Sequence, residues 1–396
     1  MSNESASRSI PVLGEAADGR AVSAFELFFD LVFVFAVTQV TSLLAADPTL
    51  PGLGRGLLVL AALWWNWVGY AWLTNTIEPE DLTTRLVVFG AMGSMLIVSL
   101  AVPGAFGANG VLFGLAYLIT RLLWLALYLR GSREDADLRA AILRLAAPSV
   151  IGPTLLTVAG SATGSLRIWL WVAALVVDYL GPIVGGTKGW RVSPSHFAER
   201  HGLIVIIALG ESIVAIGVGA AGQKIEAGVV AAAILGLVVL CTIWWAYFDV
   251  VAPVAARKLS ELTGAARNGL ARDSYSYLHL LLVGGIVLFA LGVKTTLAHV
   301  GETLPLVPAI GLAGGAALYL VGHLLFRLRN LGTVNRPRAV ATIVLLALVP
   351  VARHVPALAA LACVATTTTT LIAYEVVRYR EARERVRSRE IATRAR

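Results

Sequence analysis

The sequence has little charge and few cysteines for its length. Only 14% of its 396 residues are charged, whereas soluble domains carry about 25%. The two cysteines, Cys241 and Cys363, each lie in an apolar run, which excludes a disulfide framework and favours small buried side chains. The net charge of +8 does not indicate nucleic-acid binding, because the arginines lie between apolar runs and in the C-terminal tail.

Motifs of common catalytic and cofactor chemistry are also missing. The sequence has no GxxxxGKS/T phosphate loop, no HExxH, no CxxC, no GxSxG elbow and no aspartate-rich pairs of a magnesium–diphosphate transferase. It therefore favours a protein that is not an enzyme and that holds no metal or cofactor. Carboxylates alone can perform acid–base work, so a membrane-embedded enzyme stays as an alternative.

Long apolar runs dominate what is present, with 58% hydrophobic residues and a mean hydropathy of +0.79. A bilayer core of about 30 Å needs about 20 helical residues. The sequence predicts an all-α, polytopic integral membrane protein with about twelve spans, at 24–46, 53–75, 84–103, 110–130, 139–160, 166–186, 200–221, 227–251, 273–295, 304–326, 338–353 and 356–379. The run 338–353 is the weakest, because it is short and Pro350 and Pro356 interrupt it.

The basic residues support this count. If both termini are inside, 26 of the 32 basic residues fall on inner segments. Five fall outside and Arg121 falls within the fourth span; the outer five are Arg55, Arg167, Lys224, Lys294 and Arg353. Positive charge favours the cytoplasmic side. We therefore expect a multi-pass protein of the bacterial plasma (inner) membrane with cytoplasmic N- and C-termini.

The second half of the sequence echoes the first. The segment "FELFFDLVFVFAVTQVTSLL" (25–44) aligns with 198–217, and the tryptophan pair in 60–73 has a counterpart in 237–250. Six spans per half give the halves one orientation, so they would be parallel repeats; chance similarity of apolar helices is the alternative. The predicted organisation is a cytoplasmic tail (1–22), two six-helix repeats (23–187 and 188–380) and a basic cytoplasmic tail (381–396).

Two carboxylates stand near the cytoplasmic end of the first span. Glu26 and Asp30 are four residues apart and share a helix face. They either pair with arginines such as Arg85, Arg144 or Arg200, or contribute to a pathway or ligand site.

The seventh span carries further polar side chains. Glu211 lies about 18 Å along the helix from Glu199, near mid-membrane, where a carboxylate is a functional candidate. Its polar neighbours in the sequence, together with Asp249 at the end of the eighth span, complete the candidate substrate- or ion-binding set of Glu26, Asp30, Glu199, Arg200, His201, Glu211, Ser212 and Asp249.

Tryptophans and arginines suggest two further features. Trp64 lies about 16 Å into its span, so an interfacial belt does not explain it. Packing between the repeats or an aromatic cavity wall are the two explanations for the group Trp64, Trp65, Trp67, Trp244 and Trp245. We expect the arginines of the 374–396 tail to lie against anionic headgroups.

The opening "FELFFDLVFVF" and the segment "SPSHFAERHGLIVIIALGESIVAIG" (193–217) resemble the bacterial low temperature requirement A family. The second matches its His-x-x-Glu-Arg-x-Gly-Leu signature at His196, Glu199, Arg200, Gly202 and Leu203. The resemblance covers about 22–380. It implies a polytopic inner-membrane protein linked by name to growth in the cold, with no settled biochemical activity. More loosely, the plan is similar to potassium leak channels with two six-helix repeats, but their Phe-Ser-Asp is Phe28-Phe29-Asp30 here.

Three functional hypotheses follow. The first is a transporter or channel for a small solute or cation, in which Glu211, Arg200 and the Glu26/Asp30 pair form a charged site. The second is a membrane-embedded enzyme or lipid-modifying accessory, which a lipid-like ligand beside Asp249 would favour. The third is a non-catalytic envelope-adaptation protein. Expected partners are the lipid bilayer and a small solute or cation; an oligomer is compatible with the sequence.

Overall fold

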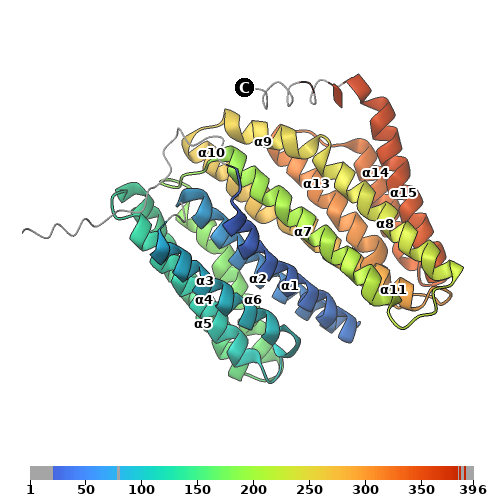
Figure 1. Cartoon of the computed structure of the whole chain (residues 1–396), viewed down its shortest axis with the longest axis horizontal. Helices are drawn as coiled ribbons and strands as arrows, with labels where there is room; N and C mark the ends of the chain where they lie inside the picture. Colours follow the sequence, from blue (N-terminus) through green and yellow to red (C-terminus); the bar gives the residue numbers. More distant parts are fainter. Residues whose placement is uncertain (1–20, 78–80, 382, 385–387, 389–396) are drawn as a thin grey trace, which may run out of the picture. The chain divides into compact units, whose positions relative to one another are not determined.

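The computed structural model describes residues 21–77, 81–381, 383–384 and 388 (Figure 1). These residues form helices joined by short connections, and no strand occurs among them. The predicted N-terminal tail lies almost entirely outside the described residues, as does much of the predicted tail from 381 onward.

Eleven helical segments of the described chain are long and apolar enough to cross a membrane. Seven are single helices and four include shorter pieces: α1 (Ala24–Ala46), α2 (Leu50–Thr76), α3 (Leu82–Ala101) with η2 (Val102–Gly104), α4 (Gly110–Gly131), α5 (Ala136–Ser161), α6 (Gly164–Gly185), α7 (Pro194–Ala220), α8 (Ala227–Phe248) with α9 (Val251–Glu261), α10 (Gly264–Leu270) with η3 (Ala271–Leu278) and α11 (His279–Ala298), α12 (Leu306–Ala309) with η4 (Ile310–Gly314) and α13 (Gly315–Leu331), and α15 (Ala357–Arg378).

The weakest predicted span, 338–353, is the one that does not reach this length. It corresponds to α14, Arg336–Val351, whose 16 residues extend about 24 Å. Asn335 caps its start by accepting a hydrogen bond from the Arg338 backbone N–H at 3.2 Å. Pro350 lies in its last turn. Of the twelve predicted spans, eleven correspond to helical segments long enough to cross a membrane, and the twelfth corresponds to the shorter helix α14.

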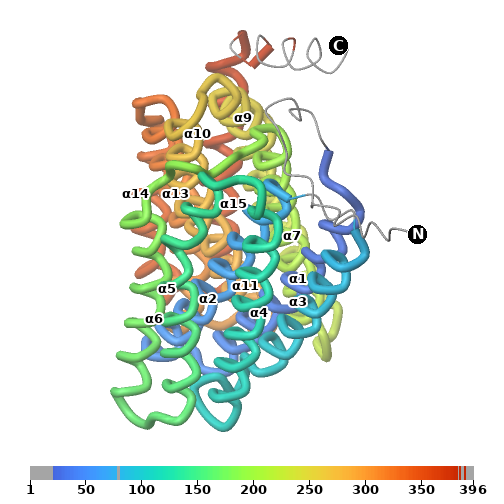
Figure 2. Tube along the Cα trace, turned by 90° about the vertical axis from the view of Figure 1, so that its left-hand side faces the viewer, coloured from blue at the N-terminus to red at the C-terminus, as the bar shows by residue number. Residues whose placement is uncertain are grey.

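The described residues divide into two compact units, and the first contains those within 21–33, 62–197 and 262–269. Within it α3 packs on α4, α4 on α5 and α5 on α6, and Figure 2 shows α5 and α6 running side by side. Glycines allow the closest of these approaches, because a Cβ on Gly114 would lie 2.3 Å from Cα of Thr157.

The second unit contains the described residues within 34–61, 198–261 and 270–388. In it α11 packs on α13, α13 on α14, α14 on α15, and α15 on α8 (Figure 1). Helices α11 and α13 approach through glycines on both sides: a Cβ on Gly285 would lie 2.6 Å from the Tyr319 nitrogen, and one on Gly315 would lie 2.6 Å from the Phe289 nitrogen. Two π-helical segments, η3 and η4, belong to these same two helical rods.

The distribution of polar and apolar side chains fits a protein surrounded by lipid. Large apolar side chains such as Val184 and Ile343 are exposed, while Glu26, Asp30 and Glu211 are at most 1% exposed. The prediction that Cys241 and Cys363 are buried is wrong, because both are exposed. An apolar run in a membrane helix does not distinguish its lipid-facing side from its packed side.

Candidate functional site

Glu26 is part of the N-terminal cap of α1. The Ser23 backbone N–H and hydroxyl donate to Glu26 Oε2 at 3.0 and 2.9 Å, and the Glu26 backbone N–H donates to the Ser23 hydroxyl at 3.3 Å. This reciprocal arrangement is a capping box, which satisfies backbone donors that a helix start leaves unpaired. The carboxylate also contacts His196 Nε2, at 3.0 Å from Oε1 and 3.1 Å from Oε2. Glu26 therefore joins the start of α1 to the start of α7.

Asn75 fixes the orientation and tautomer of His196. Its side-chain oxygen accepts from the Ser193 backbone N–H at 2.9 Å, so its nitrogen is the donor to the Ser193 carbonyl at 3.1 Å. The same nitrogen lies 2.9 Å from His196 Nδ1. Nδ1 must then accept, which places the ring proton on Nε2, the nitrogen that faces Glu26. The result is a buried chain from α2 through His196 to the carboxylate.

Asp30 lies one turn further along α1 and has a separate partner. Trp67 of α2 donates from Nε1 to Asp30 Oδ1 at 2.9 Å, and both side chains are buried. Arg144, one of the arginines predicted to pair with these acids, instead donates to the carbonyls of Gly185 and Lys188 at 2.8 and 2.5 Å. For Arg144 that prediction is wrong, because these carbonyls at the end of α6 and in the loop after it take its donors.

A second buried pair joins α4 and α6. Arg121 Nη2 lies 3.6 Å from Asp178 Oδ1 and 3.1 Å from the Ser149 hydroxyl of α5, and both charged side chains are at most 5% exposed. Gly152 leaves room for the carboxylate, since a Cβ there would lie 2.9 Å from Asp178 Cγ. The pair and the Ser149 hydroxyl connect α4, α5 and α6. Burying the two charges costs desolvation free energy, so the pair has a structural role rather than being a strong source of stability.

Glu211 of α7 lies in the second unit and is 1% exposed. It is four residues beyond the middle of the helix, about 6 Å along the axis. Thr41 of α1 is a polar neighbour, whose hydroxyl donates to the Val37 carbonyl at 3.3 Å, and Lys294 of α11 is a charged neighbour. Oε2 has no hydrogen-bond partner in the described part of the chain. Ser212 beside it bonds to the carbonyls of Ala208 and Ile286 at 3.3 and 3.4 Å, which brings α11 against α7.

A row of buried rings runs through the second unit. His279 Nδ1 donates to the Ser274 carbonyl at 2.9 Å, so Nε2 is free to accept from the Tyr247 hydroxyl at 2.8 Å. His201 lies edge-on to His279, with ring centroids 5.2 Å apart. Tyr247 is 6.1 Å by ring centroid from His323, the next histidine in the row. All four rings are at most 1% exposed.

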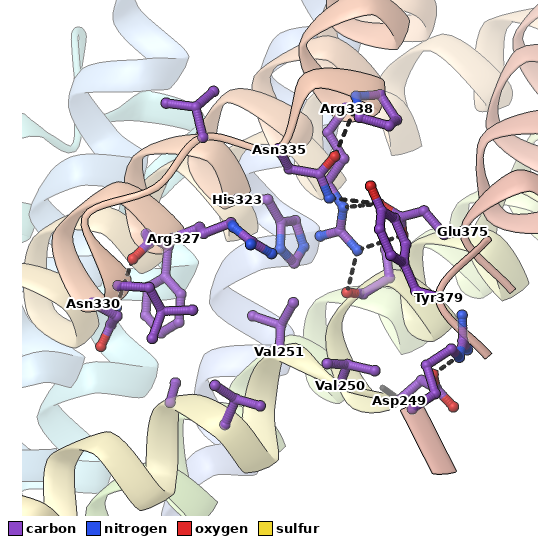
Figure 3. A pocket seen from close by; sticks show the side chains of 18 of the residues that line it. Asp249, Val250, Val251, His323, Arg327, Asn330, Asn335, Arg338, Glu375 and Tyr379 are labelled. Atoms are coloured by element: carbon purple, nitrogen blue, oxygen red, sulfur yellow. Dashed lines mark hydrogen bonds and ion pairs between the residues drawn. The ribbon is translucent and has the colours of Figure 1, made fainter. Parts of the chain in front are cut away.

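Asp249 lies at the end of α8 and pairs with Arg383. The expectation that the tail arginines lie against headgroups is therefore wrong for Arg383, which is 8% exposed and whose guanidinium stacks 5.8 Å from the Trp245 ring centroid. Close by, Arg338 of α14 binds Glu375 of α15 through Nε and Nη2, each at 2.9 Å. Figure 3 shows the labelled side chains of this region around a cavity of about 440 Å³.

The predicted site residues of the second unit fall at two levels. A Cβ on Gly202 would lie 3.4 Å from the Phe248 ring, so the start of α7 and the end of α8 lie together, with Arg200, His201 and Asp249 at this end. Glu211 is about 16 Å along α7 from Arg200. Glu199 is exposed, unlike its neighbours in the motif.

Sequence reasoning missed several residues that contact the buried acids. His196 appeared only as a motif residue, and no role was predicted for Asn75, Arg338 or Glu375. The signal that could have found Asn75 and Glu375 is a polar side chain inside a predicted membrane span. Among the described residues, no group of three or more His, Cys, Asp or Glu side chains could hold a metal ion.

The long apolar helices, lipid-type surface and buried acids define a multi-pass α-helical membrane protein. Residues 21–373 match the family described as bacterial low temperature requirement A protein (LtrA), and the chain belongs to this family. A relative from Rhizobium meliloti (strain 1021), named uncharacterized protein RA0937, is 33% identical over 320 residues, covering 78% of this chain and 77% of the relative. No solved structure matches.

Proposed function

We propose that the protein is a transporter or channel for a small solute or cation and not an enzyme, with Glu211 as its central charged group. One observation carries the proposal: a carboxyl group buried in the interior of α7 has an oxygen, Oε2, without a hydrogen-bond partner in the described chain. A buried carboxylate that is only partly satisfied is costly, so it is rarely kept for packing alone. It is suited to bind a proton or a cation that arrives and leaves.

The surroundings of Glu211 support exchange of such an ion. Lys294 is half-buried near the end of α11, and its ammonium group balances the charge of the carboxylate when the cation is absent.

The proposal also includes the number of membrane spans, their orientation and an internal repeat. We infer that α14 crosses the membrane despite its length, which gives twelve spans, cytoplasmic termini and a location in the bacterial plasma membrane, because the arginine distribution then obeys the positive-inside rule. We also infer two parallel six-helix repeats. The packing order α3–α4–α5–α6 parallels the order α11–α13–α14–α15, as two copies of one plan would. The family name adds a role in growth in the cold.

A second candidate function has its own support. The cavity beside Asp249 is lined by Trp245, so an aromatic residue of the second tryptophan pair lies at a space large enough for a ligand. Pockets for small ligands range from about 300 to 1,000 Å³. A lipid-modifying accessory is the alternative that this cavity favours.

Proteoliposome flux tests the transport proposal. The protein is reconstituted with a panel of monovalent cations, protons and small neutral solutes, and uptake is compared for wild type, Glu211→Gln and Glu226→Gln. Glu226 is an exposed acid before α8 whose side chain makes no cap bond, so it is the matched control. We expect at least one solute whose flux falls more than about tenfold in Glu211→Gln alone. If wild type and Glu211→Gln move every member of the panel equally poorly, transport through Glu211 is rejected.

A further inference from the structure

The cavity at the end of α8 is lined by more basic than acidic side chains. Four arginines line it (Arg327, Arg336, Arg338 and Arg383) against two acids (Asp249 and Glu375), which leaves a net charge of +2. Arg338 and Arg383 are neutralised by Glu375 and Asp249. Arg327 and Arg336 are exposed and have no acidic partner among the residues that the structure describes. The excess positive charge therefore belongs to these two side chains.

Buried polar atoms face the same cavity. His323 of α13 is 1% exposed, and neither of its ring nitrogens has a hydrogen-bond partner in the described chain. Figure 3 shows its ring beside the hollow, between Arg327 and Arg338. Asn330 donates to Ser274 and to the Phe326 carbonyl, at 2.9 and 2.7 Å, which leaves its Oδ1 as an unpartnered acceptor. A buried polar group without a partner costs free energy that a ligand could recover.

The rest of the lining is apolar. Val251 and Val254 belong to the start of α9, Val250 directly precedes it, and Tyr379 also lines the space. Trp245 is 38% exposed where α8 meets the cavity, and amphipathic tryptophans favour the headgroup level of a bilayer. The space thus combines guanidinium groups, an imidazole and an apolar wall at the end of a membrane helix.

We propose that this cavity binds a phosphate ester, supplied by the headgroup of an anionic phospholipid of the adjoining leaflet. Guanidinium forks match phosphate oxygens in pairs. Arg327 donates from Nε to the Thr333 hydroxyl at 3.0 Å, which leaves its two Nη groups for phosphate oxygens, and Arg336 supplies the second guanidinium. His323 donates to a phosphate oxygen from one ring nitrogen. The valines and Trp245 contact the glycerol and upper acyl carbons. Basic pockets between membrane helices on the cytoplasmic side bind anionic headgroups in this manner.

Native mass spectrometry of the full-length protein in a neutral detergent tests the proposal. Phosphatidylglycerol, phosphatidylcholine, glycerol 1-phosphate and inorganic phosphate are titrated in separate arms. The variants are Arg327→Gln/Arg336→Gln and the matched control Arg353→Gln, which removes an exposed arginine beyond the other end of α14. All three positions are exposed, so the variants are expected to fold; thermal unfolding verifies this.

We expect one phosphatidylglycerol to bind tightly, with about 30-fold weaker binding in the double variant and unchanged binding in Arg353→Gln. The factor corresponds to about 2 kcal/mol, at about 1 kcal/mol for each arginine near a headgroup. Binding of glycerol 1-phosphate or inorganic phosphate with the same arginine dependence would support the phosphate site and assign it a soluble ester instead of a lipid. Equal binding of phosphatidylcholine, or equal loss in the control and double variants, would overturn the proposal.

Discussion

The ion pair between Arg338 and Glu375 allows one stability prediction to be worked out in detail. Nε and Nη2 of Arg338 each lie 2.9 Å from a different oxygen of Glu375, and both side chains are 8% exposed. Asn335 donates to the same carboxylate at 2.8 Å, and Arg338 Nη2 also lies 3.2 Å from the Ala246 carbonyl. One guanidinium therefore connects α14, α15 and α8.

Removing one partner should be far more damaging than removing both. Glu375→Ala leaves the Arg338 charge buried without compensation, which lowers the free energy of unfolding by about 3–5 kcal/mol. In Arg338→Met/Glu375→Leu both charges are gone and the volumes are similar. The double variant then loses about 1–3 kcal/mol, mainly because the Ala246 carbonyl lacks its donor. The second substitution should thus restore stability lost in the first.

Titration with sodium dodecyl sulfate in mixed micelles, followed by intrinsic tryptophan fluorescence, measures these differences. Glu261→Gln is the control, since Glu261 makes exposed pairs with Arg257 and Lys258 at 3.7 and 3.4 Å. Exposed pairs contribute at most about 1 kcal/mol. The reasoning is refuted if Glu375→Ala costs no more than the control, or if the double variant is less stable than Glu375→Ala.

Two further predictions concern the first unit. Asn75→Ala removes the partners of the Ser193 backbone and of His196 Nδ1, so we expect a loss of about 2–4 kcal/mol in the same titration; an unchanged midpoint would contradict the hydrogen-bond assignment. Partial burial raises the pKa of Asp81, but hydrogen bonds from Thr84 outweigh it and hold the pKa below its ordinary value. A lowered folded-state pKa stabilises the protein above the ordinary value of about 3.9, and this contribution is lost as the pH falls through the folded pKa. The difference in melting temperature between wild type and Asp81→Asn should therefore shrink from pH 7 to pH 3, and a constant difference would argue against it.

The helices could be predicted closely because membrane insertion depends on local composition. Predicted runs such as 110–130 and 166–186 agree with α4 and α6 to within a few residues. The prediction was least secure for α14, whose apolar run is short and interrupted by proline, and the helix there has only 16 residues. The π-helical segments η3 and η4 left no such signal, because they alter the backbone without changing hydropathy.

The partners of the polar groups could not be predicted, because they depend on which helices become neighbours. Glu26 and His196 are 170 residues apart, and Asp30 and Trp67 are 37 apart. Both acids are suited to arginine by charge, so the sequence offered arginine partners beside a pathway or ligand role. The contacts that the sequence did not predict are a histidine held by Asn75 and an indole N–H. Burial of Glu211 followed from the cost of exposing a carboxylate to acyl chains, which composition alone implies.

The second unit is built from segments that lie far apart in the sequence, which has a consequence for its biosynthesis. Its first segment, residues 34–61, emerges from the ribosome well over a hundred residues before its next segment begins at residue 198. Such distant contacts are slow to form, since a long loop must close before they contribute. A C-terminal half expressed by itself would lack 28 residues of this unit. Co-expression of residues 1–187 with 188–396 should therefore rescue membrane assembly that the latter fragment cannot complete alone.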